Sequence, residues 1–115
     1  MYTMAILTKA KPGVSTEQFL EHYRTTHFEL ASRLPGLVGY QQARVAHGAE
    51  AWTSPEPYPD YDALSIYTFE SYEAARAAFD SEAGRAVDAD TGLFIDWPTV
   101  LFAPAEILQA FRRDP

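Results

Sequence analysis

The stretch that decides the fold is residues 15–36, which read STEQFLEHYRTTHFELASRLPG. Ser15 stands three residues before Gln18. This is the spacing of a capping box, in which each side chain accepts a hydrogen bond from the other residue's backbone N–H at the start of a helix. Pro35 and Gly36 are typical of the residues that stop a helix. The stretch therefore predicts one helix between these two signals.

The apolar side chains of this helix fall on one face at the helical period of 3.6 residues. Glu21, Thr25 and Ser32 fall on the opposite face, as expected for a helix that lies on a sheet with its far side in water. His27 is the one group of the apolar stripe that titrates near neutral pH, whereas His22 lies outside the stripe and is expected to face solvent. The stripe consists of Phe19, Leu20, Tyr23, His27, Leu30 and Leu34.

Outside the helix, four segments have the β-branched and aromatic character of strands. They are residues 2–9, 37–46, 62–69 and 97–103, with Gly39 a possible bulge and Pro98 suited to an edge strand. Ser71 is a suitable N-cap for a second helix over residues 72–83, which Gly84 would end. Residues 85–96 are expected to form a short helical turn and a loop.

Two further segments lack a regular pattern. Residues 46–61 hold Pro55, Pro57 and Pro59 among polar residues, which predicts a long loop. Loops of this length are often functional, so Trp52 and Tyr58 are candidates either for a lid over a ligand or for packing against a partner chain. Residues 104–115 are expected to form a C-terminal tail.

The resulting order is strand, helix, strand, strand, helix, strand. It predicts an α+β fold of the ferredoxin-like βαββαβ kind over residues 1–115, a single domain whose four-stranded antiparallel sheet carries two helices on one face. The other face of such a sheet stays bare, and a second copy of the chain is the simplest way to cover it. We therefore expect a homodimer.

Composition excludes several classes of function. The 115 residues include no cysteine, so disulfides, thiolate nucleophiles and Cys-ligated zinc or iron–sulfur sites are excluded. The net charge is -7 and the basic residues are scattered, which argues against a nucleic-acid partner. No apolar run approaches the length of a membrane span, and no signal-peptide pattern is visible, so we expect a cytoplasmic protein. The absence of a Gly-rich phosphate loop argues against a nucleotide cofactor, and none is expected.

The candidate catalytic residues are His27 and Tyr23. An imidazole on a core-facing stripe can both take and give protons near pH 7. Tyr23 lies one turn earlier, and its hydroxyl could orient the imidazole or donate to a substrate carbonyl. The alternative is that His27 only completes a hydrogen-bond network of the core. His22 lies five positions before His27, which separates the two side chains by ~140° on a helix, so no shared metal site is expected.

Further candidates support or line the expected pocket. Asp90 and Asp96 flank Phe94, and either could polarise His27 or fix the segment before the last strand. Rings on strands can line a pocket, although they also serve cores and interfaces. The pocket candidates are Phe19, Leu30, Tyr40, Tyr67, Phe69, Phe94, Trp97 and Phe102.

These residues form a pattern that resembles the EthD family of the dimeric α/β-barrel superfamily. Its most specific part is the helix with an aromatic residue four positions before His27, followed by Leu34-Pro35-Gly36. The remaining matches are Lys11-Pro12-Gly13, Phe19, residues 21–27, Leu37, Tyr40, Tyr61-Asp62-Ala63-Leu64, Phe69-Glu70-Ser71, Asp90 and Phe94. Tyr23 stands where a Trp is common in the family, and the Pro-rich loop before residue 62 is long.

The resemblance implies two ferredoxin-like subunits packed sheet to sheet, with a ligand pocket between the helices and the sheet of each. Members of the superfamily include a methylmuconolactone isomerase, polyketide dehydratases and cyclases, and cofactor-free oxygenases. We therefore expect a cofactor-independent isomerase, dehydratase or cyclase that acts on a small hydrophobic, cyclic or aromatic carbonyl compound in catabolism or secondary metabolism. The alternatives are a non-catalytic dimer that binds a hydrophobic intermediate, and a cofactor-free oxygenase.

Overall fold

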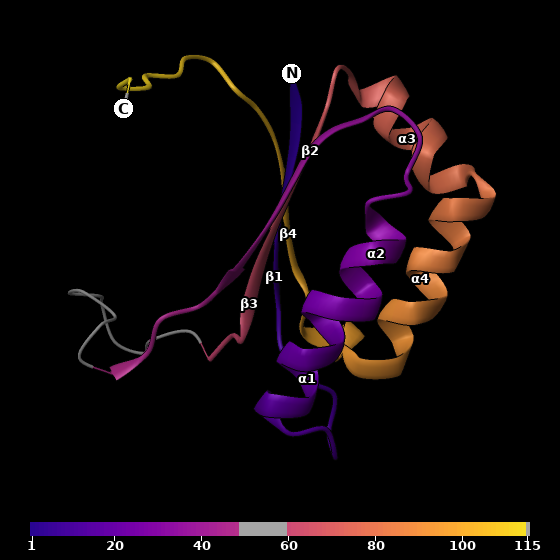
Figure 1. Ribbon diagram of the computed structural model, residues 1–115, viewed down its shortest axis with the longest axis vertical. Coiled ribbons are helices and arrows are strands. Elements are labelled where there is room, and N and C mark those ends of the chain that lie inside the picture. The colour runs from indigo at the N-terminus through magenta and orange to yellow at the C-terminus, as the bar shows by residue number, and fades with distance from the viewer. Residues whose placement is uncertain (49–59, 115) are drawn as a thin grey trace.

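A four-stranded antiparallel sheet with helices packed on one face makes up the computed structural model, which describes residues 1–48 and 60–114 (Figure 1). Its strands are β1 (Tyr2–Thr8), β2 (Leu37–Arg44), β3 (Ala63–Phe69) and β4 (Leu101–Glu106), in the spatial order β2-β3-β1-β4. The pairing of β2 with β3 shifts register between Leu37 and Gly39, where a bulge was expected. The predicted ferredoxin-like topology is confirmed. The loop residues Trp52 and Tyr58 lie outside the described residues.

The first helix is continuous but has a wider turn at its centre. It consists of α1 (Thr16–His22), a π-helical turn η1 (Tyr23–His27) and α2 (Phe28–Ala31). The capping box of Ser15 and Gln18 forms as predicted, with N–H···O distances of 3.1 and 3.0 Å. The Tyr23 carbonyl accepts the backbone N–H of Phe28 and also the Nε2–H of Gln42 at 2.7 Å. Since a side chain of β2 bonds to this turn, the sheet helps to hold the π geometry in place.

The second helical region differs from the prediction, because it contains two helices and no loop over residues 85–96. These are α3 (Tyr72–Asp80) and α4 (Glu82–Phe94). Ser81 separates them with an extended backbone (φ -77°, ψ 170°), and its hydroxyl accepts the N–H of Gly84 as an N-cap. Gly84 therefore lies in the first turn of a helix rather than at the end of one. Asp90 and Thr91 are buried polar residues of α4. Because polar residues occupy buried positions, the sequence of α4 lacks the apolar periodicity that predicts a helix.

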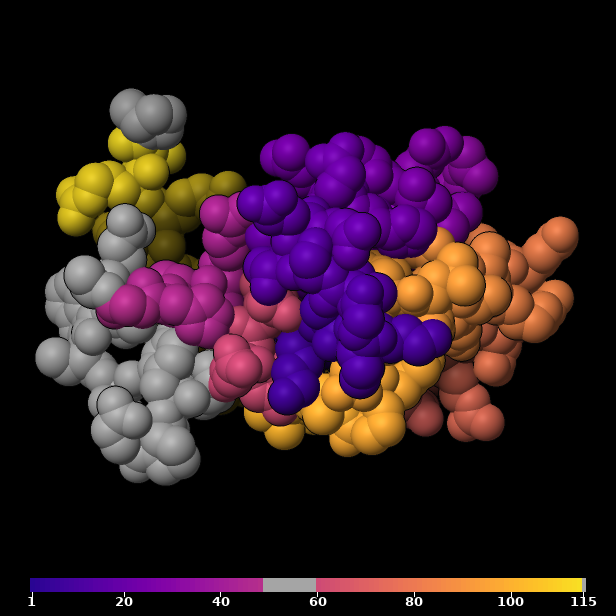
Figure 2. Space-filling model, turned by 90° about the horizontal axis from the view of Figure 1, so that it is seen from below, coloured from indigo at the N-terminus to yellow at the C-terminus, as the bar shows by residue number. Residues whose placement is uncertain are grey.

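The last strand also begins later than predicted. Residues Trp97–Thr99 form a 3-10 turn, η3, and β4 runs through Pro104 to Glu106. Pro98 fits an early position of a helical turn, and Pro104 is tolerated because β4 is an edge strand that pairs with β1 alone. The residues that follow β4 are exposed and extend away from the helices (Figures 1 and 2).

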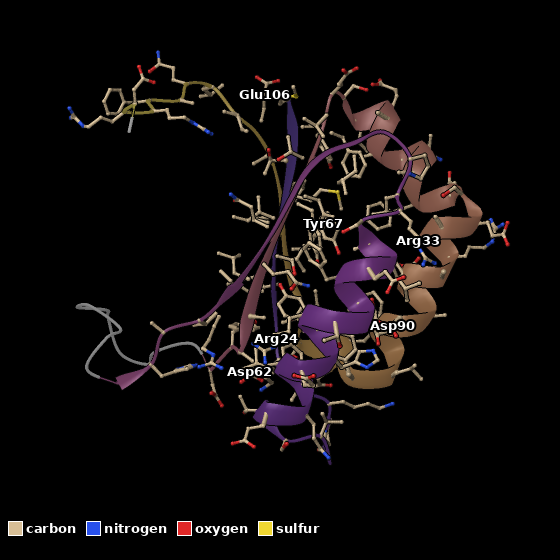
Figure 3. All side chains as sticks on the ribbon, in the orientation of Figure 1. Arg24, Arg33, Asp62, Tyr67, Asp90 and Glu106 are labelled. Carbon is tan, nitrogen blue, oxygen red and sulfur yellow. The ribbon has the colours of Figure 1, made fainter. Side chains whose placement is uncertain are left out.

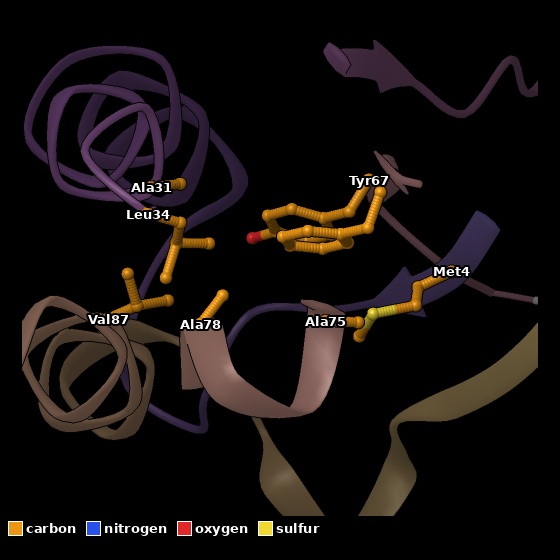
Figure 4. Packing of buried hydrophobic residues seen from close by; sticks show 8 residues of the cluster. Met4, Ala31, Leu34, Tyr67, Ala75, Ala78 and Val87 are labelled. Carbon is orange, nitrogen blue, oxygen red and sulfur yellow. The ribbon is translucent and has the colours of Figure 1, made fainter. Parts of the chain in front are cut away.

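The core lies between the sheet and the helices. One cluster of buried side chains joins β1 and β3 to α2, α3 and α4, and Figure 4 shows Tyr67 at its centre, facing Leu34 and Val87. A second cluster joins the first helix to the end of α4 through Phe19, Tyr23 and Phe94. Most of the predicted stripe is thus buried. Its buried members, all at most 4% exposed, are Phe19, Tyr23, His27 and Leu34, whereas Leu20 and Leu30 are half-buried.

In the part of the chain that the structure describes, no helix covers the opposite face of the sheet (Figure 1). Along β3 the helix-facing positions are buried, whereas Leu64, Ile66 and Thr68 on the other face are only half-buried. The register places Ala5 of β1 opposite Ile66, and Leu7 opposite both Leu64 and Leu101. No helix in the described part of the chain has the length and apolar character needed to cross a membrane.

The junction of α3 and α4 depends on Gly84. A Cβ atom there would lie 2.4 Å from the Cα and O atoms of Phe79 and 2.5 Å from the carbonyl oxygen of Ala78. We expect Gly84→Ala to lower the free energy of unfolding by about 3 kcal/mol, because backbone atoms cannot rotate out of the way. Urea-induced unfolding would measure the change.

Gly92→Ala is the matched control, since Gly92 lies in the same helix and its Cβ would meet nothing closer than Trp97 Nε1 at 3.8 Å. It should raise the free energy of unfolding by about 0.5–1 kcal/mol through helix propensity. Equal effects of the two substitutions would contradict the close packing of α3 on α4.

Candidate functional site

A buried carboxylate on α4 faces the first helix and binds His27. Asp90 Oδ2 lies 2.8 Å from His27 Nδ1, and the two side chains are 6% and 3% exposed (Figure 3). A carboxylate can only accept a hydrogen bond, so Nδ1 carries the proton and Nε2 of the neutral ring keeps its lone pair. No described residue forms a hydrogen bond with Nε2. The hydrogen bond to Asp90 thus holds the ring in one tautomer.

His22 binds the other oxygen of the same carboxylate. Its Nε2 lies 2.8 Å from Asp90 Oδ1, and its side chain is 30% exposed. The expectation that His22 simply faces solvent is therefore wrong. The two rings diverge around the helix, but Asp90 offers them two separate oxygen atoms from the facing helix. Within the described residues, no group of three or more His, Cys, Asp or Glu side chains is arranged to hold a metal ion.

Burial decides the charge of His27. Desolvation lowers its pKa from the ordinary value of 6.5, and the nearby His22 lowers it further, whereas the hydrogen bond and the charge of Asp90 oppose the change. The net direction is downward, so the imidazole is neutral at pH 7 and can accept a proton.

Tyr23 does not orient the imidazole through its hydroxyl, which was one of its two expected roles. The hydroxyl lies 2.6 Å from Ser65 Oγ and donates to the Leu64 carbonyl at 3.2 Å, so it points at β3. Its ring instead packs near the His27 ring, with centroids 6.1 Å apart. Burial raises the pKa of Tyr23. Asp90 is the residue that orients His27.

A cavity of about 260 Å³ lies beside His27, between α4 and the sheet. Of the predicted pocket residues, Tyr67, Trp97 and Phe102 line it. The other predicted residues do not line the cavity. The side chains of Phe19, Phe69 and Phe94 are buried in the core, and Leu30 packs against the core. The Tyr40 ring stacks on the Tyr67 ring, with centroids 4.5 Å apart. The remaining wall was not identified from the sequence and consists of Met4, Ile6, Thr8, Ser65, Phe79, Val87, Asp88, Thr91, Ile95 and Val100.

Thr8 and Asp96 are two further residues to place, one on the cavity wall and one before β4. Thr8 is 3% exposed, and its hydroxyl oxygen is buried without a hydrogen-bond partner among the described residues. Asp96 fixes the segment before β4, because its backbone N–H donates to Lys9 and its carbonyl accepts the backbone N–H and the hydroxyl of Thr99. Asp90 is thus the one of the two acids that contacts His27, whereas the contacts of Asp96 are made by its backbone.

A larger hollow of about 480 Å³ lies between the first helix and β2. Charged side chains surround it, among them Glu17, Arg24 and Arg44, and Tyr23 lines this hollow rather than the cavity beside His27. Neither His22 nor His27 reaches it. Of these two hollows, the smaller cavity is therefore the one that an imidazole lines.

The sequence matches the EthD domain family over residues 11–98. The chain belongs to the EthD family. No curated protein matches the sequence. The EthD resemblance inferred from the helix and its Leu-Pro-Gly end is thus confirmed over most of the chain.

Solved structures show the same fold at low sequence identity. An EthD family protein from Bacillus halodurans C-125 has a TM-score of 0.74 at 21% identity, covering 94% of this chain and 100% of its own. A dimeric ferredoxin-like protein from Thermobifida fusca YX has a TM-score of 0.67 at 17% identity, covering 92% and 90%. SnoaB, a cofactor-independent oxygenase from Streptomyces nogalater, has a TM-score of 0.66 at 13% identity, covering 97% of both chains. The chain thus shares its ferredoxin-like fold with these proteins.

The lowered pKa of His27 predicts a pH dependence of stability. As pH falls below about 6.5, the unfolded chain binds a proton at this imidazole that the folded chain does not, so the free energy of unfolding falls. Most carboxylates titrate at lower pH, and urea unfolding at about pH 7.5 and about pH 5.5 isolates this window. His27→Gln should reduce the loss between the two values. An unchanged loss in this variant would show that His27 is not the group responsible.

Proposed function

We propose that this EthD protein is a cofactor-independent enzyme that moves protons on a small hydrophobic carbonyl compound. The observation that supports the proposal is the Asp90–His27 pair, in which a buried carboxylate binds one nitrogen of a ring that lines a cavity. A base oriented by a carboxylate is the usual arrangement for general acid–base catalysis.

The chemistry begins with a carbon acid. His27 Nε2 takes a proton from the carbon next to the carbonyl group, and the electron pair of the broken C–H bond moves onto the carbonyl oxygen. The charge of Asp90 stabilises the imidazolium that forms. The imidazolium then returns the proton, either to another carbon, which isomerises the compound, or to a departing hydroxyl group, which releases water and completes a dehydration.

The cavity suits such a step because most of its wall is apolar. Met4, Ile6, Val87, Ile95 and Val100 contribute aliphatic surface, and Tyr67 contributes a ring that is 3% exposed. A wall of this kind excludes water, so the charges of Asp90 and of protonated His27 act in a medium of low dielectric constant. Binding of a hydrophobic compound follows from the same surface.

A second candidate function is cofactor-free oxygenation. SnoaB, which shares the fold, is a cofactor-independent oxygenase. Here the same imidazole would deprotonate an electron-rich phenol, and the resulting anion would supply the electrons that reduce dioxygen. Consumption of dioxygen with a naphthol, and loss of product under anaerobic conditions, would favour this reaction over isomerisation or dehydration.

We also infer that the protein is a homodimer in which the bare faces of two sheets pack together. Ile66, Leu64 and Leu101 form part of an apolar surface that no described segment of the chain covers. An apolar sheet face of this kind is unusual on a soluble monomer. Two neighbours of the same fold, from Thermobifida fusca and Bacteroides fragilis, are dimeric ferredoxin-like proteins.

Proton exchange tests the proposed enzyme directly. With 2-tetralone in D2O, the protein should accelerate exchange of the protons next to the carbonyl group, as followed by NMR. His27→Gln should lower this rate by about 10²- to 10⁴-fold, because the base is lost. His47→Gln is the matched control, since it removes an imidazole that bonds to the Tyr61 carbonyl, away from the cavity. If 2-tetralone binds but exchanges only at the buffer rate, the protein is a carrier and not an enzyme.

Sedimentation velocity tests the dimer. At micromolar concentration the protein should have the mass of two chains, and Ile66→Glu should convert it to a monomer, because a buried unpaired carboxylate at the interface is costly. Leu93→Glu is the control, since Leu93 is 66% exposed on α4, away from the bare sheet face. A wild-type protein that sediments as one chain would contradict the inference.

A further inference from the structure

We propose that the cavity beside His27 takes an uncharged compound of one or two rings, and that Asp88 at the cavity wall selects against carboxylates. The inference rests on the proposed function, because it names the ligand class of the same site. It depends on the size of the cavity, on the charges around it and on the polar groups of its wall.

The volume sets the size of the ligand. An apolar cavity of about 150 Å³ holds benzene, so the cavity of about 260 Å³ has room for two fused rings. The aromatic side chains that line it in the described part of the chain are Tyr67, Phe79, Trp97 and Phe102. Trp97 and Phe102 are 51% and 46% exposed, so they form part of the entrance. Flat ligands suit such a wall, because rings stack or meet edge to face with other rings.

The charges around the cavity are negative or absent. Among the described residues, its wall contains no Lys or Arg side chain, and the carboxylate that lines it is Asp88. Asp88 forms none of the ion pairs found among the described residues. Asp90 adds a second carboxylate behind His27. A carboxylate ligand would lose its water shell without meeting a cation and would be repelled by both acids.

The polar groups of the wall suit a neutral oxygen atom. Thr8 and His27 both line the cavity, and the Thr8 hydroxyl is buried with no hydrogen-bond partner among the described residues. A buried hydroxyl without a partner costs free energy, and a carbonyl or hydroxyl group of a ligand would offset that cost. These two groups can bind a ketone, an amide or an alcohol, none of which needs a counter-charge.

Binding of two compounds of the same shape tests the proposal. By calorimetry at about pH 7.5, 2-naphthamide should bind at least about tenfold more tightly than 2-naphthoate, which differs from it by a negative charge. Asp88→Asn should raise the affinity for 2-naphthoate by about three- to tenfold and leave that for 2-naphthamide unchanged. Glu82→Gln is the matched control, because it removes the same charge from an exposed first-turn position of α4 without touching the cavity.

The outcomes separate this inference from the proposed function. Equal or tighter binding of 2-naphthoate, or an unchanged ratio in Asp88→Asn, would overturn the selection by Asp88. Failure of both compounds to bind at millimolar concentration would overturn the assignment of a two-ring ligand. Both readouts are independent of turnover, so a protein that prefers the amide but fails to exchange protons on 2-tetralone contradicts only the proposed enzyme.

Discussion

The structure depends on one buried carboxylate that two imidazoles share. Asp90 is 6% exposed, and each of its oxygens lies 2.8 Å from a ring nitrogen of the first helix. A buried charge without such partners would cost several kcal/mol, so the position of Asp90 requires both rings. The same two contacts connect α4 to the first helix across 63 and 68 residues of sequence. The hydrogen bonds of Asp90 therefore both connect the two helices and orient the His27 ring.

The π-helical turn belongs to the same arrangement. Tyr23 and His27 lie at its two ends, and both are buried, with Tyr23 bonded to β3 and His27 to α4. The widened turn is held from the sheet by Gln42, which bonds to the Tyr23 carbonyl. Turns of this kind cost stability and are found frequently at functional sites. Here the turn joins the two residues that the sequence selected, but it gives them different neighbours.

Local signals in the sequence were sufficient for most of the fold. The capping box at Ser15 and the alternation over residues 62–69 predicted the first helix and β3, since both depend on neighbouring residues. The break at Ser81 was missed because a run of alanines and a small residue can continue a helix equally well. The bounds of the last strand differ because an edge strand tolerates either Pro98 or Pro104, and local sequence does not distinguish which of them lies within it. The hydrogen bond between His27 and Asp90 could not be predicted from the sequence alone, since the packing of two helices brings these residues together.

The interpretation that His27 only completes a core hydrogen-bond network accounts for Nδ1 but not for Nε2. A residue that only completes a core network would place both ring nitrogens against partners, because unpaired buried polar atoms are costly. Asp90 satisfies Nδ1, yet no described residue forms a hydrogen bond with the other ring nitrogen, and His27 lines a cavity. Thr8 repeats the pattern with a hydroxyl that has no partner. An apolar residue at either position would fill the space at lower cost, so two such groups on one wall favour a site that a ligand completes.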